Sequence, residues 1–157
     1  MKLKAITGIV LTVFLASMLT LAFDVQSVKA DSEILYSVDH NLNLVTIDPV
    51  TCNVSVVGYV GYGVESLCFS PNGTLYASAD IDAGLHMMAD TLITIDRETG
   101  NSTIIGPIGY GDVEFIAFAP DGTLYGADTY TDLLIKIDTM TGAGTQLGPT
   151  SFLVNGG

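Results

Sequence analysis

Two glutamates occupy matching positions in the chain and are the clearest candidates for shared chemistry. Glu65 lies in the segment VESLCFSPNG and Glu114 in VEFIAFAPDG, each directly after a valine. If these segments form equivalent strands of neighbouring repeats, the two carboxylates point toward one end of the structure, where a divalent cation such as Ca²⁺ could bind. The alternative is a pair of solvated or hydrogen-bonded carboxylates. The pair therefore predicts either a metal site at Glu65 and Glu114 or no cofactor.

A second group of metal-binding residue types lies in the segment IDAGLHMMAD, residues 81–90. His86, Met87 and Met88 are soft-metal ligands by type, but adjacent methionines alternate in direction in an extended chain and make a poor cage. We therefore expect a loop that contacts a partner or is partly buried. The chain carries no nucleophile elbow, zinc-protease helix, phosphate loop or dinucleotide fingerprint. This disfavours catalysis.

The elements that must position these residues are copies of one unit. The segment ILYSVDHNLNLVTIDPVTCNVSVVGYVGYG returns as TLYASADIDAGLHMMADTLITIDRETGNSTIIGPIGYG and again as TLYGADTYTDLLIKIDTMTGAGTQLGPT. A period of about 40 residues indicates a repeat architecture. We place repeat 1 at residues 34–63, repeat 2 at 64–112 and repeat 3 at 113–157.

Each unit is predicted to form four short strands. Runs such as FIAFA stop at Pro-Asp-Gly, and TLYGA, LIKID and GTQLG follow with a Thr-Gly turn before the last. Such turns and alternating runs are typical of antiparallel strands. Asp48, Asp96 and Asp138 end one strand of each unit, where we expect their side chains to accept turn N–H groups.

No helical period is visible after the leader, so we expect an all-β fold of β-propeller repeats, each repeat a four-stranded antiparallel blade. The first copy starts at its second strand and the chain ends before another axial strand. The expected strands therefore number about 11 and form an incomplete ring. A fragment of a longer protein, assembly of several chains, and an open partial propeller all remain open, with the fragment preferred.

The repeat resembles those of NHL/YVTN-type secreted β-propellers, on the pattern of an apolar strand, PDGTLY, a strand ending in ID, TG and a strand ending in G. The resemblance covers nearly all of residues 34–149. It implies that the strand containing Glu65 or Glu114 lines the axis. In gluconolactonase-like propellers an axial glutamate is a metal ligand, so the resemblance permits that role here.

Connections between strands alternate between the two ends of each blade, which sorts the loops into two faces. One face carries the three glycosylation sequons, at Asn53, Asn72 and Asn101. We expect the opposite face to bind a partner. Its predicted residues are Asp80, Asp82, His86, Met87, Met88, Asp90, Tyr110, Asp112, Tyr130 and Asp132.

Two cysteines are too few for a disulfide scaffold. Cys52 takes the turn position held by Gly100 and Gly142, whereas Cys68 lies in an axial strand. These places are too far apart for a bridge, so we predict no disulfide.

The N-terminus resembles an export signal, with Lys2 and Lys4 before an apolar run from Ile6 to Phe23 and small residues near Ala30. We predict a signal peptide at residues 1–30, a partial propeller at 31–157, and a secreted or cell-surface location; an uncleaved anchor is the alternative. After cleavage 2 basic residues remain against 16 acidic ones. That balance disfavours nucleic acid and, once the signal is removed, an anionic membrane as partner.

These observations predict an exported β-propeller module, without catalysis, that binds a protein or glycan through its acidic loop face. The alternative is a fragment of a divalent-metal lactonase or lyase that uses Glu65 and Glu114. Self-assembly that completes the propeller is a further expectation.

Overall fold

The computed structural model describes residues 34–81 and 90–150. The predicted signal peptide, and with it Asp82, His86, Met87 and Met88, lies outside these ranges. Within the described ranges, no helix is long and apolar enough to cross a membrane.

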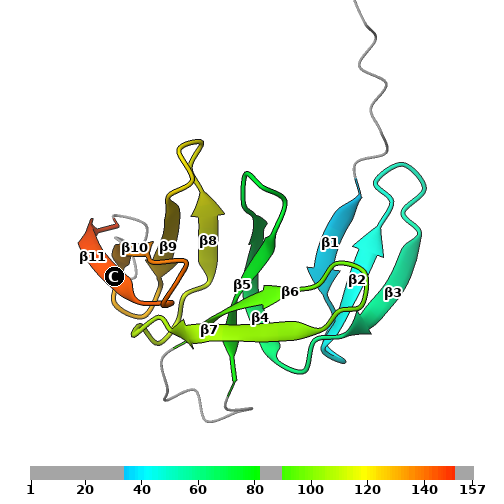
Figure 1. Cartoon of the computed structure of the whole chain (residues 1–157), viewed down its shortest axis with the longest axis horizontal. Coiled ribbons are helices and arrows are strands. Elements are labelled where there is room, and N and C mark those ends of the chain that lie inside the picture. Colours follow the sequence, from blue (N-terminus) through cyan, green and yellow to red (C-terminus); the bar gives the residue numbers. More distant parts are fainter. Residues whose placement is uncertain (1–33, 82–89, 151–157) are drawn as a thin grey trace, which may run out of the picture. The chain divides into compact units, whose positions relative to one another are not determined.

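The described chain forms 11 strands in three antiparallel sheets, coloured in chain order in Figure 1. We call the sheets blades 1, 2 and 3. Blade 1 has three strands: β1 (Leu35–Val38), β2 (Asn43–Ile47) and β3 (Val54–Tyr59). Blade 2 has four: β4 (Gly63–Phe69), β5 (Leu75–Asp80), β6 (Thr91–Ile95) and β7 (Ser102–Pro107). Blade 3 also has four: β8 (Phe115–Phe118), β9 (Leu124–Asp128), β10 (Leu133–Ile137) and β11 (Gly144–Pro149).

Within each blade, successive strands along the chain pair with one another, so each blade is a meander. The turns have the expected chemistry. The Oδ1 of Asp96 accepts the N–H groups of Glu98 and Thr99, both at 2.9 Å, and Asp48 and Asp138 do the same in the other blades. This confirms the turn role predicted for the three aspartates. Each carboxylate accepts backbone N–H groups of the turn that are not paired within a strand.

Each blade has two faces, which follow from strand alternation and register. We call the face turned toward the following blade the trailing face and the other the leading face. The trailing face of blade 2 carries Ser66, Tyr76, Ser78 and Leu92, and the matching positions of blade 3 are Phe115, Tyr125, Ala127 and Leu134.

The core lies between successive blades rather than inside one sheet. One buried cluster joins Leu44 of blade 1 to Leu75, Ala77 and Ile93 of blade 2. A second joins Leu92 of blade 2 to blade 3, where it includes Val113, Ile116, Leu124, Ile135 and Ile137. Burial of apolar area between blades thus stabilises their packing.

Aromatic pairs repeat at the two junctions. Tyr36 of blade 1 meets Phe69 of blade 2 with ring centroids 5.4 Å apart, and Tyr76 meets Phe118 of blade 3 at 5.3 Å. Both pairs are edge-to-face, the geometry that aromatic quadrupoles favour. Three blades with this packing form an all-β partial propeller of 11 strands, as expected from the repeats.

Candidate binding edge

One end of the blades, which we call the loop edge, comprises the β1–β2, β3–β4, β7–β8 and β9–β10 connections together with the end of β5 and the start of β6. The turn edge comprises the β2–β3, β4–β5, β6–β7, β8–β9 and β10–β11 turns. The described carboxylates at or beside the loop edge are Asp39, Glu65, Asp80, Asp90, Asp112, Glu114, Asp128 and Asp132.

Asp128 organises the β9–β10 connection. Its side chain is 1% exposed, its Oδ1 accepts the N–H of Asp112 at 2.9 Å, and its Oδ2 accepts both the N–H and the hydroxyl of Thr131. Asp112 in turn accepts the hydroxyl of Thr129 at 2.7 Å. A buried carboxylate of this kind is tolerated because donors satisfy its oxygens.

Asp90 holds the segment that enters β8. It is 4% exposed, and its Oδ2 accepts the N–H of Val113 at 2.5 Å. The hydroxyl of Ser78 donates to the carbonyl of Val113 at 2.7 Å. Asp90 and Ser78 therefore bind both polar backbone groups of Val113, which ties the segment that enters blade 3 to blade 2.

The loop edge is strongly negative around Asp90. Burial raises the pKa of Asp90 to about 6, the Val113 N–H opposes this rise, and the charges of Glu65, Asp112 and Asp80 add to it. Of the described basic residues, Arg97 lies in the β6–β7 turn at the turn edge and Lys136 lies within β10. Neither stands among the described residues of a loop-edge connection, so acidic side chains dominate the potential of that part of the loop edge.

Glu65 and Glu114 are both exposed, Glu65 within β4 and Glu114 just before β8. No group of three or more His, Cys, Asp or Glu residues that could hold a metal ion is found in the described part of the chain. The metal role predicted for this pair stays a prediction.

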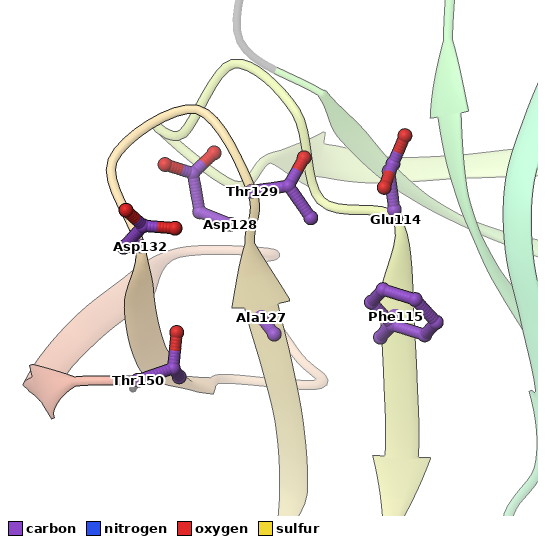
Figure 2. A pocket seen from close by; sticks show the side chains of 7 residues that line it. All are labelled: Glu114, Phe115, Ala127, Asp128, Thr129, Asp132 and Thr150. Carbon is purple, nitrogen blue, oxygen red and sulfur yellow. The ribbon is translucent and has the colours of Figure 1, made fainter. Parts of the chain in front are cut away.

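A pocket of about 580 Å³ opens beside β9 (Figure 2). Its lining residues are Glu114, Phe115, Ala127, Asp128, Thr129, Asp132 and Thr150. Phe115 and Ala127 are on the trailing face of blade 3, whereas the same positions of blade 2, Ser66 and Ser78, contact the backbone of blade 3. The pocket therefore occupies the place that a following blade fills at the preceding junction.

The structure brings some predicted binding-face residues together and separates others. Asp90 and Asp112 lie close, and the carbonyl of Tyr110 accepts the N–H of Asp90 at 2.8 Å. Tyr130 is 83% exposed and stands apart in the β9–β10 connection. Sequence reasoning missed Asp128, although it ends LYGAD as Asp39 ends LYSVD.

The turn edge carries the sequons and one cysteine. Asn53, Asn72 and Asn101 lie in or beside the β2–β3, β4–β5 and β6–β7 turns. Both cysteines are free: Cys52 is exposed, and burial raises the pKa of the partly buried Cys68 thiol to about 11.

Comparison with known proteins identifies the fold and no family. No protein-family model matches the chain, and no curated protein matches it. A solved structure described as a "putative gluconolactonase" is 16% identical, with a TM-score of 0.51 over 74% of this chain and 45% of that one. A "putative 6-phosphogluconolactonase" from Bacteroides fragilis is 20% identical, with a TM-score of 0.48 over 75% of this chain and 35% of that one. The chain thus spans less than half the length of either structure.

Proposed function

We propose that this chain is an exported, non-catalytic β-propeller module that binds a basic protein surface through its loop edge. The observation that carries the proposal is the environment of Asp90, where the charges of Glu65, Asp80 and Asp112 act on one buried carboxyl. Such a potential attracts cationic partners and raises their association rate, more strongly at low salt.

In this proposal the buried carboxylates anchor the loop edge and the exposed carboxylates contact the partner. Asp90 and Asp128 are buried and hold backbone N–H groups, so they shape the edge. Glu65 and Glu114 are exposed, so they are the groups that a partner can reach. A basic protein is preferred over a free cation because the described residues present no group of three metal ligands.

A lysine-rich decapeptide, titrated against the full chain by fluorescence anisotropy, tests this function. Binding should weaken steeply between low and physiological salt. Glu65→Gln and Glu114→Gln should each weaken it several-fold, because each removes a charge from the loop edge. Glu98→Gln is the matched control, since Glu98 is exposed in the β6–β7 turn at the opposite edge. Equal weakening by Glu98→Gln would show non-specific attraction to net charge and would contradict the proposal.

The export part of the proposal rests on the N-terminal leader. Residues 1–30 carry the signal-peptide pattern described above. N-terminal sequencing of the protein recovered outside the cytoplasm should begin at Asp31. A product that stays in the membrane and still begins at Met1 would support an uncleaved anchor instead.

A divalent-metal lactonase or lyase fragment is the second candidate. The fold likeness to a "putative gluconolactonase" favours it, and Glu65 and Glu114 would supply two of the metal's oxygen ligands. Calorimetric titration with Ca²⁺, Mg²⁺ and Zn²⁺ separates the two candidates. Stoichiometric binding that Glu65→Gln abolishes would favour the metal enzyme, whereas the basic-protein proposal expects no such binding.

A further inference from the structure

Successive blades approach each other so closely that two glycines are required. A Cβ added at Gly58 of blade 1 would lie 1.9 Å from the carbonyl oxygen of Thr99 in blade 2. A Cβ at Gly106 of blade 2 would lie 2.3 Å from the carbonyl oxygen of Thr141 in blade 3. Neither Gly58 nor Gly106 has a positive φ, so close approach between blades, and not backbone conformation, explains the glycines.

Blade 3 keeps the same glycine where nothing approaches it. Gly148 is the counterpart of Gly58 and Gly106. Each of the three glycines pairs with a leucine of the preceding strand, and the register of the two strands shifts directly after that leucine. A Cβ at Gly148 would meet no atom within 4 Å, and Gly148 has no positive φ either. The described structure therefore contains no local reason for glycine at this position.

Other trailing-face residues of blade 3 repeat the pattern. Leu134 is 38% exposed, whereas its counterparts Leu44 and Leu92 are 0% exposed beneath the next blade. Tyr125 matches Tyr36 and Tyr76, each of which packs against a phenylalanine of the following blade. The trailing face of blade 3 thus carries the residues of a blade junction in a partly or fully exposed state.

The chain also leaves blade 3 as it leaves the other blades. The N–H of Thr150 donates to the carbonyl of Asp132 at 2.7 Å, and the N–H of Ile108 donates to the carbonyl of Asp90 at 2.7 Å. Beyond Ile108 the chain enters the next blade. Thr150 therefore makes the backbone contact that Ile108 makes where the chain leaves blade 2.

A blade that packs on the trailing face of blade 3 must carry a glycine in its outer turn. Gly100 and Gly142 are the turn residues that contact Gly58 and Gly106, and a Cβ on either would lie 2.5 or 2.3 Å from the opposing backbone. Blade 1 has Cys52 at that turn position. A Cβ there is incompatible with an equally close approach to Gly148, so blade 1 of a second copy is a poor occupant.

We propose that the trailing face of blade 3 is a docking surface for a fourth blade of this repeat, joined through Thr150 and carrying glycine in its outer turn. Its axial strand fills the pocket between Phe115 and Asp132, as the segment from Val113 to Ile116 covers blade 2. This surface has the same glycine, leucine and tyrosine positions as the two blade junctions within the structure. This inference does not depend on the binding function proposed for the loop edge.

An extended protein tests the proposal. In the extended protein, a second copy of residues 108–149 follows Pro149 directly, in place of residues 150–157. The Ile108 of this copy stands where Thr150 does, and a duplicate of blade 3 follows it. Gly148→Ala should leave the melting temperature of the full 157-residue chain unchanged, because no described atom is near. In the extended protein the same substitution should lower it by about 5 °C or more. Gly106→Ala should lower it in both proteins.

A second measurement does not depend on the stability of a glycine variant. The thiol of Leu134→Cys should react quickly with a maleimide in the 157-residue chain and at least tenfold more slowly in the extended protein, as followed by peptide mapping. Equal labelling rates, an extended protein that does not fold, or equal effects of Gly148→Ala in the two proteins would overturn the proposal. A dimer of the 157-residue chain that Gly148→Ala dissociates would also overturn it, because a second copy would then be the occupant.

Discussion

Asp90→Asn should stabilise the protein near neutral pH, although it removes a buried residue's charge. Burial raises the pKa of Asp90 to about 6 from an ordinary value of 3.8, with contributions from Glu65, Asp112 and Asp80. The folded state therefore binds more protons than the unfolded state between these two values. Ionisation of Asp90 therefore lowers the free energy of unfolding. The loss is complete above about pH 6, and the stability returns as the pH falls toward 3.8.

The magnitude follows from the shift. Raising the pKa of Asp90 from 3.8 to about 6 corresponds to about 3 kcal/mol at most. Solvent and salt screen the three neighbouring carboxylates at the loop edge, so we expect about 1 to 2 kcal/mol. The asparagine keeps an oxygen that can accept the Val113 N–H, so the junction with blade 3 is retained. The expected gain is a rise in melting temperature of about 4 to 8 °C at pH 7.5.

Urea denaturation between pH 4.5 and pH 8 at constant ionic strength measures this effect. The parent protein should lose stability as the pH rises through this range, and Asp90→Asn should flatten the profile. Asp39→Asn is the control of opposite sign, because the N–H groups of Asn43 and Asn41 lower the pKa of that exposed carboxyl. It should destabilise the protein at pH 7.5. The reasoning fails if Asp90→Asn is less stable than the parent at pH 7.5 and its pH profile is unchanged.

Three further experiments probe the blade junctions and the cysteines. Ser78→Ala should cost about 1 to 3 kcal/mol in urea denaturation, because it leaves a buried backbone carbonyl of the segment before β8 without its donor; a neutral effect would mean that water replaces the hydroxyl. Leu92→Ala should lower the free energy of unfolding by about 2 to 5 kcal/mol. Leu134→Ala, at the matched position that is 38% exposed, should lower it by under about 1 kcal/mol. Similar losses would show that the trailing face of blade 3 is covered. With a thiol reagent at pH 7.5, the exposed Cys52 should react quickly and the partly buried Cys68, whose thiol has a pKa of about 11, much more slowly. Equal reaction rates of the two thiols would contradict the partial burial of Cys68.

The strands and turns of this protein are encoded locally and could be read from its sequence. Alternating residues such as those of LITID and LIKID form β6 and β10, and the aspartate that ends each run caps the turn that follows. These features depend on residues a few positions apart, so three similar copies fold into three similar meanders. The repeat, the all-β fold and the division of loops between two edges follow from the same short-range patterns.

Burial and electrostatics depended on which blades have a following neighbour. Asp90 and Asp132 stand in the same place, one residue before β6 and β10, so no local pattern separates them. Yet Asp90 is 4% exposed beneath the segment that enters blade 3, whereas Asp132 lines an open pocket. In the same way, three glycines match in the sequence, but only Gly58 and Gly106 meet an opposing backbone. The sequence by itself determined the repeat and its strands, whereas only the tertiary structure decided which carboxylate is buried and which glycine is in contact, because both depend on atoms supplied by the next blade.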